Sequence, residues 1–277
     1  MGSGCGLGLS SGAGIRRGGG ACYCPSIRRT ASRSGRSCKP LNRCQLTKRF
    51  YKTAQVGHTD DGFIVKLDGA PIKTPSVNPM AIPYRSLAQA VADEWQGQGD
   101  KVDPKSMPLT GLVNTAIDRT PTDRAAMTIA VLRHAETDLL CYRAETPTDL
   151  VRLQQQTWQP LLDWSAEQFD AQLIITNGIL PVSQPPAALA ALESALDNFN
   201  DLEFTALATL CAACGSLIVA LALAHGHIDG DQAFVVAELD HDYQVQTWGA
   251  DDEAVARQRT LKSDIANTMT ILTAAKR

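Results

Sequence analysis

The stretch ELDHDYQVQTWG, residues 238–249, places three carboxylates, a histidine, a tyrosine and a tryptophan within twelve positions. Carboxylates and an imidazole this close together are typical of acid–base catalysis or metal binding. In a helix, however, Asp240 and Asp242 are about 200° apart, so they cannot converge on one ion. Glu238 and His241 have the ligand spacing of carboxylate-bridged metal bundles, but those need a second such pair, and the sequence offers none. The segment is therefore either a solvated acidic face or an acidic binding surface.

A second group of candidate ligands is the CAAC at 211–214 followed by the HGH at 225–227. These residues imitate a Cys-Cys-His-His zinc set. If one continuous helix carries them, Cys214 and His225 are roughly 16 Å apart along its axis, too far to share one ion. Buried thiols are the favoured interpretation. The rival hypothesis is a metal- or thiol-dependent enzyme using Cys211, Cys214, His225 and His241.

Other catalytic signatures are absent from the sequence. It has no G-x-x-x-x-G-K-[ST] loop for a nucleoside triphosphate. It has neither a G-x-S-x-G elbow nor an H-E-x-x-H helix. We therefore expect no enzymatic activity, no nucleotide, no metal and no other cofactor.

Two kinds of sequence pattern predict the elements that position these residues: a strand-and-turn pattern followed by a helical one. Asp-Gly pairs at 61–62 and 68–69 punctuate short apolar runs, so residues 50 to about 83 predict a small antiparallel sheet. A helix capped by Ser86 should cover it. Beyond Thr120 the periodicity is helical, with candidates over 120–138, 149–169, 187–199, 202–225, 230–248 and 251–275. The predicted fold class is α+β, with a small domain over 49–118 and a larger helical domain over 119–277.

One segment, Phe204 to Ala224, carries no charge over twenty-one residues, which is long enough to cross a bilayer. It also contains two cysteines, two threonines and many alanines, which are weak membrane formers. We favour a central helix buried in a bundle and expect no stable membrane insertion.

The charge distribution divides the chain. Residues 1–49 hold ten Lys or Arg and no acid, whereas the rest holds sixteen basic and twenty-nine acidic residues, a net charge of −13. Such an acidic body argues against nucleic-acid binding, which needs clustered positive charge. Residues 1–48 are rich in Gly, Ser and Arg and predict a disordered basic leader. Its alternatives are a transit peptide or an extended start. Only three of the eight cysteines lie in the body, which favours a reducing intracellular compartment.

Several residues are expected to stabilise the fold. The aromatic residues should be packing anchors: Trp95, Trp158, Trp164, Tyr243 and Trp248. In the segment ETDLLCYR, Glu136, Asp138 and Arg143 predict a partly buried ionic network that joins the domains. Direct contact with a protein partner is the alternative for these three.

An ordered set of motifs carries a family resemblance: KRFYK, GFIVKLDGAPIKTP, ADEW, MPLTGLVNTAIDR, ETDLLCYRAETPTDLVRLQQQTWQPLLDW and ELDHDYQVQTWG. From Lys48 to the C-terminus the chain resembles the ATP synthase assembly chaperones that act on the alpha subunit. The resemblance implies a small α+β domain followed by an orthogonal helical bundle, and mitochondrial or bacterial origin.

The resemblance also implies a function. The implied function is that of a non-enzymatic chaperone that holds the unassembled alpha subunit, prevents its aggregation and releases it to the beta subunit. An acidic position before the Q-x-x-W-G ending is functionally sensitive in that family, and Asp240 and Asp242 both match it. We therefore expect Glu238, Asp240 and Asp242 to contact the client. The compartment would be the mitochondrial matrix if the leader is a transit peptide, and otherwise the bacterial cytoplasm.

Overall fold

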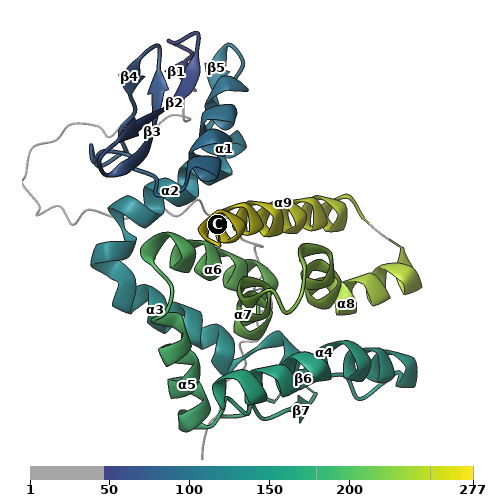
Figure 1. The fold of residues 1–277 in the computed structure, drawn as a ribbon. Helices are drawn as coiled ribbons and strands as arrows, with labels where there is room; N and C mark the ends of the chain where they lie inside the picture. The colour runs from purple at the N-terminus through teal and green to yellow at the C-terminus, as the bar shows by residue number, and fades with distance from the viewer. Residues whose placement is uncertain (1–46, 179, 250, 277) are drawn as a thin grey trace, which may run out of the picture. The chain divides into compact units, whose positions relative to one another are not determined.

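The computed structural model describes residues 47–178, 180–249 and 251–276. The described residues all belong to one compact unit. The predicted leader lies outside the described residues except for its last two, Thr47–Lys48, which form strand β1. The fold is α+β, with small antiparallel sheets followed by a helical region, as the sequence predicted (Figure 1).

A three-stranded antiparallel sheet follows, in the order β2-β3-β4. Its strands are β2 (Ala54–Thr59), β3 (Gly62–Leu67) and β4 (Ala70–Pro71). The β2–β3 hairpin closes with Thr59 opposite Gly62. Gly62 has φ +130°, and a Cβ there would lie 2.8 Å from the Ile82 carbonyl oxygen, so only glycine fits. A second, two-stranded sheet pairs β1 with β5 (Lys101–Val102).

Helix α1 (Arg85–Gln96) packs on β2 and β3 through Leu87, Ala88, Val91 and Ala92. Its N-cap is Tyr84, without a side-chain hydrogen bond, so the prediction of Ser86 as the cap was wrong. A 3-10 turn (Pro104–Ser106) then leads into α2 (Pro108–Asp118).

Glu94, near the end of α1, fixes the start of α2. Its carboxylate accepts hydrogen bonds from the Leu109 and Thr110 backbone N–H groups at 2.7 and 2.8 Å, and from Thr110 Oγ1 at 2.7 Å. The first turn of a helix has unpaired N–H donors, and an anion there is favourable. This contact joins the ADEW segment to the MPLTG segment.

The remaining elements are mainly helical. They are α3 (Thr120–Glu136), a 3-10 turn (Leu139–Cys141), β6 (Tyr142–Arg143), α4 (Thr148–Phe169), β7 (Thr176–Asn177), α5 (Pro186–Leu196), α6 (Asp201–Cys214), α7 (Leu217–His225), α8 (Gly230–Trp248) and α9 (Asp252–Ala275). Helix α6 contacts α2, α3, α7 and α9, which makes it the centre of the helical packing. Figure 1 shows α6 and α7 in green beside α9 in yellow.

The charge-free segment is not one helix, so the prediction of a continuous helix over 202–225 was wrong. Helix α6 ends at Gly215, which has the left-handed φ of +67°, and Ser216 caps α7 by accepting from the Val219 N–H at 3.0 Å. Gly is the usual residue at such a stop and Ser at such a start. No helix in the described ranges is both long and apolar enough to span a membrane.

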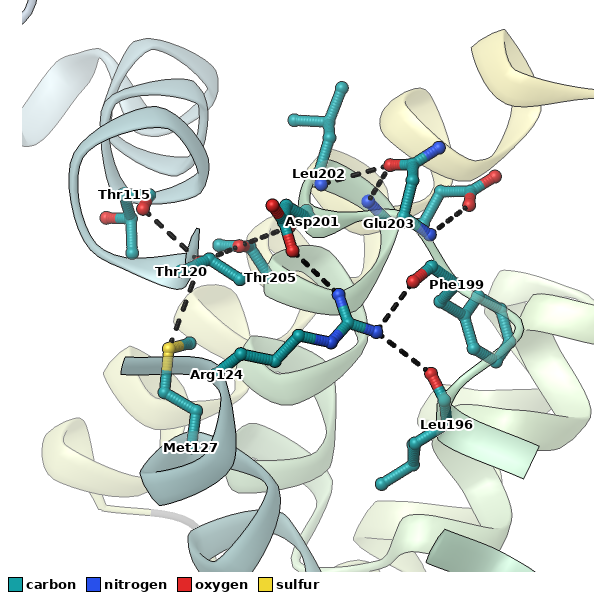
Figure 2. Close-up of polar contacts among 11 residues, drawn as sticks. Thr115, Thr120, Arg124, Met127, Leu196, Phe199, Asp201, Leu202, Glu203 and Thr205 are labelled. Atoms are coloured by element: carbon teal, nitrogen blue, oxygen red, sulfur yellow. Dashed lines mark hydrogen bonds and ion pairs between the residues drawn. The ribbon is translucent and has the colours of Figure 1, made fainter. Parts of the chain in front are cut away.

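Arg124 of α3 holds the connection between α5 and α6 (Figure 2). Its guanidinium donates to the Asp201 carboxylate at 2.8 Å and to the carbonyl oxygens of Leu196 and Phe199 at 3.1 and 2.6 Å. The same group lies 4.4 Å from the centre of the Phe204 ring. One side chain therefore joins the last residue of α5, the loop that follows it and the first residue of α6.

Two apolar clusters form the core. The larger lies among the helices α3 to α9, and the smaller lies under the sheet against α1 and α2. The smaller cluster also includes Leu202 and Ala206 of α6 and Ile271 and Ala274 of α9. The sheet region thus shares its core with helices far along the chain.

Candidate functional site

Helix α8 carries most of the acidic motif, and its position is fixed at its start. Asp229 and Gln232 form a capping box: the Asp229 carboxylate accepts from the Gln232 N–H at 2.8 Å, and the Gln232 side chain accepts from the Asp229 N–H at 2.9 Å. Gly230 lets α8 approach α9 closely, because a Cβ there would lie 3.2 Å from Ile265 Cγ2. The start of α8 is therefore capped and packed closely on α9, and the motif occupies the second half of the helix.

Glu238 does not reach the surface. It is fully buried, and both of its oxygens accept from Arg257 Nη2 of α9, at 2.6 and 2.7 Å. The Arg257 side chain is about half exposed. The prediction that Glu238 contacts a client was therefore wrong for this conformation, because its carboxylate joins α8 to α9.

Asp240 is half-buried between α8 and α4. It accepts a hydrogen bond from Gln154 Nε2 at 2.7 Å, and Gln154 Oε1 in turn accepts from the Ala144 N–H at 2.8 Å. Burial raises the pKa of Asp240, while the Gln154 hydrogen bond and the charge of Arg143 act to lower it. This carboxylate is part of the packing between α4 and α8 and is also partly accessible.

Asp242 points to α9, on the other side of α8 from Asp240. It accepts from Gln258 Nε2 at 2.7 Å. His241 Nε2 is buried and has no hydrogen-bond partner in the described chain, so it forms no pair with Glu238. The predicted separation of Asp240 and Asp242 around the helix is thus observed. Asp240 binds α4 and Asp242 binds α9.

The two aromatic residues of the motif behave differently. Tyr243 is partly buried, and its hydroxyl donates to the Asp149 carboxylate of α4 at 3.0 Å. Trp248, the last residue of α8, is 78% exposed. The prediction of Trp248 as a packing anchor was wrong, because the side chain lies at the end of the helix with most of its surface in solvent.

The predicted ionic network of Glu136, Asp138 and Arg143 is not formed. Glu136 is exposed, and no ion pair joins these residues in the described part of the chain. Asp138 is fully buried and accepts backbone N–H groups instead: Leu217 at 2.9 Å and Ile218 at 3.2 Å. It is an anionic cap on α7 supplied from outside that helix.

Arg143 is buried beside α4, and its hydrogen bonds also go to backbone groups. Nε donates to the Leu140 carbonyl at 2.7 Å and Nη1 to the Gln154 carbonyl at 2.8 Å. Its guanidinium lies 5.2 Å from the centre of the Trp158 ring, and Trp158 Nε1 donates to the Val236 carbonyl at 3.0 Å. The Trp158 hydrogen bond attaches α4 to α8 one helical turn before Asp240, and Arg143 holds the segment before α4 against that helix.

The other two tryptophans are partly buried. Trp164 stacks on His227 with ring centres 4.8 Å apart. Trp95 lies edge-on to Tyr51 at 5.7 Å. The role of both residues as packing anchors stays a prediction.

The thiols do not form a reactive site. Cys141, Cys211 and Cys214 are free and buried, and burial raises the pKa of Cys141 and Cys214 to about 12 and that of Cys211 further. Thiols react as thiolates, so these are poor nucleophiles. Among the described residues, no group of three or more His, Cys, Asp or Glu could hold a metal ion. The geometry thus gives no support to the rival enzyme hypothesis.

Sequence reasoning missed the partners of the three acids, namely Arg257, Gln154 and Gln258. One signal was available: Gln154 lies four residues from both Leu150 and Trp158, on the apolar stripe of α4. A glutamine on a buried stripe needs a polar partner from another element. The identity of that partner depends on tertiary packing.

Comparison with known proteins places this architecture in a family. The ATP12 chaperone protein family is matched over residues 48–166. A crystal structure of Atp12 from Paracoccus denitrificans is 35% identical, covers 82% of this chain and 98% of its own, and superposes with a TM-score of 0.76. The chain belongs to the ATP12 chaperone family. A putative chaperone from Agrobacterium tumefaciens, Atu1473, is 38% identical over 83% of this chain and 87% of its own, with a TM-score of 0.78.

A further ATP12 relative is the protein named atp12, mitochondrial, from Schizosaccharomyces pombe. It is 25% identical over 219 residues, which are 75% of each chain. ATP12 proteins are chaperones of ATP synthase assembly, so the sequence-based prediction of the family and of its assembly role is confirmed. The relatives include one mitochondrial protein and proteins of two bacteria.

Proposed function

We propose that this ATP12 chaperone binds the unassembled alpha subunit of the ATP synthase catalytic head and holds it until the beta subunit takes its place. The isolated subunit exposes apolar interface that would otherwise aggregate. The role needs no chemistry, which agrees with buried, high-pKa thiols and with a sequence that lacks a nucleotide loop.

The observation that carries the proposal is the free end of α8. Trp248 leaves 78% of its side chain exposed at the tip of the acidic motif. Tryptophan is the residue type most enriched at the centres of protein interfaces, and a large exposed aromatic side chain is unfavourable in water unless a partner covers it. Exposed acids follow directly at Asp251 and Asp252. This end of α8 therefore combines an aromatic anchor with negative charge.

Asp240 and Asp242 are proposed as the carboxylates that orient the client at this surface. Both keep part of their surface accessible. The body of the chain is strongly acidic, so the field around α8 favours a basic segment of the client and increases its rate of encounter. Asp242 lies nearer in sequence to Trp248 and is the first choice for a direct contact.

The test is capture of the purified alpha subunit by the immobilised chaperone. Trp248→Ala should weaken capture by about tenfold, which corresponds to about 1.4 kcal/mol, because hot-spot tryptophans contribute at least this much. Its unfolding temperature should not change, because an exposed side chain contributes little to the core. Ile129→Ala, at a residue that is 57% exposed on α3, is the matched control and should bind normally.

The carboxylates are tested by Asp240→Asn and Asp242→Asn. Asparagine retains the oxygen that accepts from Gln154 or Gln258, so the helix contacts persist and only the charge is lost. Weaker capture with a flatter salt dependence would support the charge role. Normal capture by all three variants would refute the assignment to α8, and a wild-type chaperone that captures no alpha subunit would refute the proposed function.

The cellular compartment depends on whether the leader is removed. We infer the mitochondrial matrix if residues 1–48 are removed as a transit peptide, and the bacterial cytoplasm if they are retained. Mass spectrometry of the native N-terminus separates the two.

A further inference from the structure

Helices α4 and α8 lie side by side and run in opposite directions. Three hydrogen bonds along their length show this: Trp158 to Val236, Gln154 to Asp240, and Tyr243 to Asp149. Helix α7 packs against both of them, and its residues from Leu217 to Ala224 are all buried. The inner side of the helix pair is therefore covered by a third helix of the chain.

The outer side of the same pair is hollowed. A groove of about 440 Å³, called the outer groove below, has one wall on α4 and the other on α8, formed by Thr157, Pro160 and Leu161 and by Val235 and Val236. Leu161 and Val236 are buried and make its floor. Val235 is 55% exposed, and Leu153, one turn before Thr157 on the same face of α4, is 41% exposed. The outer groove thus leaves apolar surface in solvent.

The charge around the outer groove is predominantly negative. Helix α4 carries three carboxylates and one arginine, and α8 carries four carboxylates and no Lys or Arg. Glu238 is paired with Arg257 of α9, but Asp231 is exposed and lines the groove itself. In the described part of the chain, the lining includes no Lys or Arg. Apolar walls with a negative rim match a segment that combines apolar side chains with basic ones.

Two other basic or self-complementary occupants match the outer groove less well. Residues 1–48 are basic, but they are rich in Gly and Ser and have no apolar stripe at helical spacing. A second copy of this chain would bring another acidic body, because the residues after Arg49 include sixteen basic and twenty-nine acidic ones. Like charges repel, so the charge favours a basic partner of a different sequence.

We propose that the outer groove binds an amphipathic helix of the alpha subunit, with its apolar side chains between α4 and α8 and its Lys or Arg towards Asp231. A helix laid into an apolar groove is a common mode of recognition, and here it would repeat on the outer side the packing that α7 makes on the inner side. The inference rests on the proposed function, because it gives the alpha subunit a second contact, separate from Trp248 at the end of α8.

The decisive variant is Val235→Lys. It removes apolar surface from the groove wall and places a cation where the basic side chains of the bound helix would lie. Lysine is a better helix former than valine, and its ammonium would lie four residues after the Asp231 carboxylate, which is a favourable spacing. The unfolding temperature should therefore stay within about 2 °C of wild type. We expect capture of the purified alpha subunit to fall by about tenfold.

The matched control is Ile129→Lys. It makes the same change of net charge at another β-branched residue, which is 57% exposed on α3. It should capture the alpha subunit as well as wild type does, because α3 does not line the outer groove. A second groove variant, Thr157→Lys on the opposite wall, should weaken capture as Val235→Lys does.

Photo-crosslinking identifies the occupant. The photoreactive amino acid p-benzoylphenylalanine in place of Val235 should crosslink to the alpha subunit. Mass spectrometry should locate the crosslink in a segment with apolar residues at helical spacing and at least one Lys or Arg. The same amino acid in place of Ile129 should give no crosslink. Crosslinks from position 235 to residues 1–48, or to a second copy of the chain, in place of the alpha subunit would overturn the proposal.

The outcomes separate the two proposals. A wild-type chain that captures no alpha subunit refutes the proposed function, and the groove assignment with it. Normal capture by folded Val235→Lys and Thr157→Lys refutes the groove assignment alone, and so does an equal loss of capture in Ile129→Lys. Loss of capture in the two groove variants only, with an unchanged unfolding temperature, supports it.

Discussion

Removal of the Asp138 carboxylate should weaken the fold more than any surface change. This side chain is fully buried and accepts hydrogen bonds from three backbone N–H groups: Leu140 at 3.1 Å, Leu217 at 2.9 Å and Ile218 at 3.2 Å. Two of these begin α7, whose residues from Leu217 to Ala224 are all buried. Water therefore cannot readily replace the carboxylate.

The magnitude follows from those three donors. A buried N–H left without a partner costs about 1–3 kcal/mol, so Asp138→Ala should lower the free energy of unfolding by at least about 3 kcal/mol. That is a large share of the roughly 5–15 kcal/mol that stabilises a typical protein. Asp138→Asn has the same shape and retains one acceptor oxygen, so its loss should be smaller.

The pH dependence has a definite sign. Burial raises the pKa of Asp138 to about 6, although hydrogen bonds from Ser216 and three backbone N–H groups act to lower it. In the unfolded chain the pKa is about 3.9. The folded state thus binds the extra proton between about pH 4 and pH 6, and this contribution to stability is present below pH 4 and lost as the pH rises through 6. Its size is about 3 kcal/mol.

The assay is urea unfolding followed by circular dichroism, for wild type and Asp138→Asn at pH values from 4 to about 7.5. Other carboxylates titrate in the same way in both proteins, so their effect cancels in the difference between the two free energies of unfolding. Wild type should lose stability relative to Asp138→Asn as the pH rises. A difference that does not change with pH, or an Asp138→Ala variant as stable as wild type, would refute this reasoning.

Three further predictions concern the helix contacts. Arg257→Met should lower the free energy of unfolding by about 2 kcal/mol, because it leaves the buried Glu238 carboxylate unpaired; Glu238→Gln in the same background should restore part of the loss, measured by urea unfolding. Arg124→Ala should cost about 2–3 kcal/mol through the lost ion pair and two carbonyl contacts, and a change below about 0.5 kcal/mol in thermal unfolding would contradict it. Iodoacetamide labelling mapped by mass spectrometry at pH 7.5 should leave three cysteines unmodified until urea is added: Cys141, Cys211 and Cys214.

The sheet and its covering helix were predictable because their signals are local. Asp61–Gly62 and Asp68–Gly69 allow the chain to reverse, and both glycines adopt positive φ. The stripe of Leu87 and Val91 marks the buried face of α1. The start of that helix was misplaced because the cap at Tyr84 uses no side chain and leaves no mark in the sequence.

The break in the charge-free segment was harder to predict. An apolar run has no periodicity from which a helix boundary can be found. The pair Gly215–Ser216 combines a stop residue with a start residue, and this local signal would have located the break. What no local signal could show is that Asp138, far earlier in the chain, supplies the cap that makes the break favourable.

For the acidic motif, the predicted helical geometry was correct, but the neighbouring residues that its side chains contact were not predicted. The separation of Asp240 from Asp242 follows from the period of the helix alone. The burial of Glu238 could not be predicted, because carboxylates are almost never buried unless paired and its partner Arg257 lies on the next helix. The exposure of Trp248 was likewise hidden, because residue type alone favours burial.

The shared core under the sheet has a consequence for the order in which the protein can be made. Ile271 and Ala274, which complete that core, lie within the final turns of α9 and are synthesised long after the sheet. The sheet region thus stays incomplete until α9 has been made. A deletion of the last turns of α9 would therefore weaken the sheet region, and a chain whose synthesis has not yet reached α9 would lack the finished surfaces needed to receive a client.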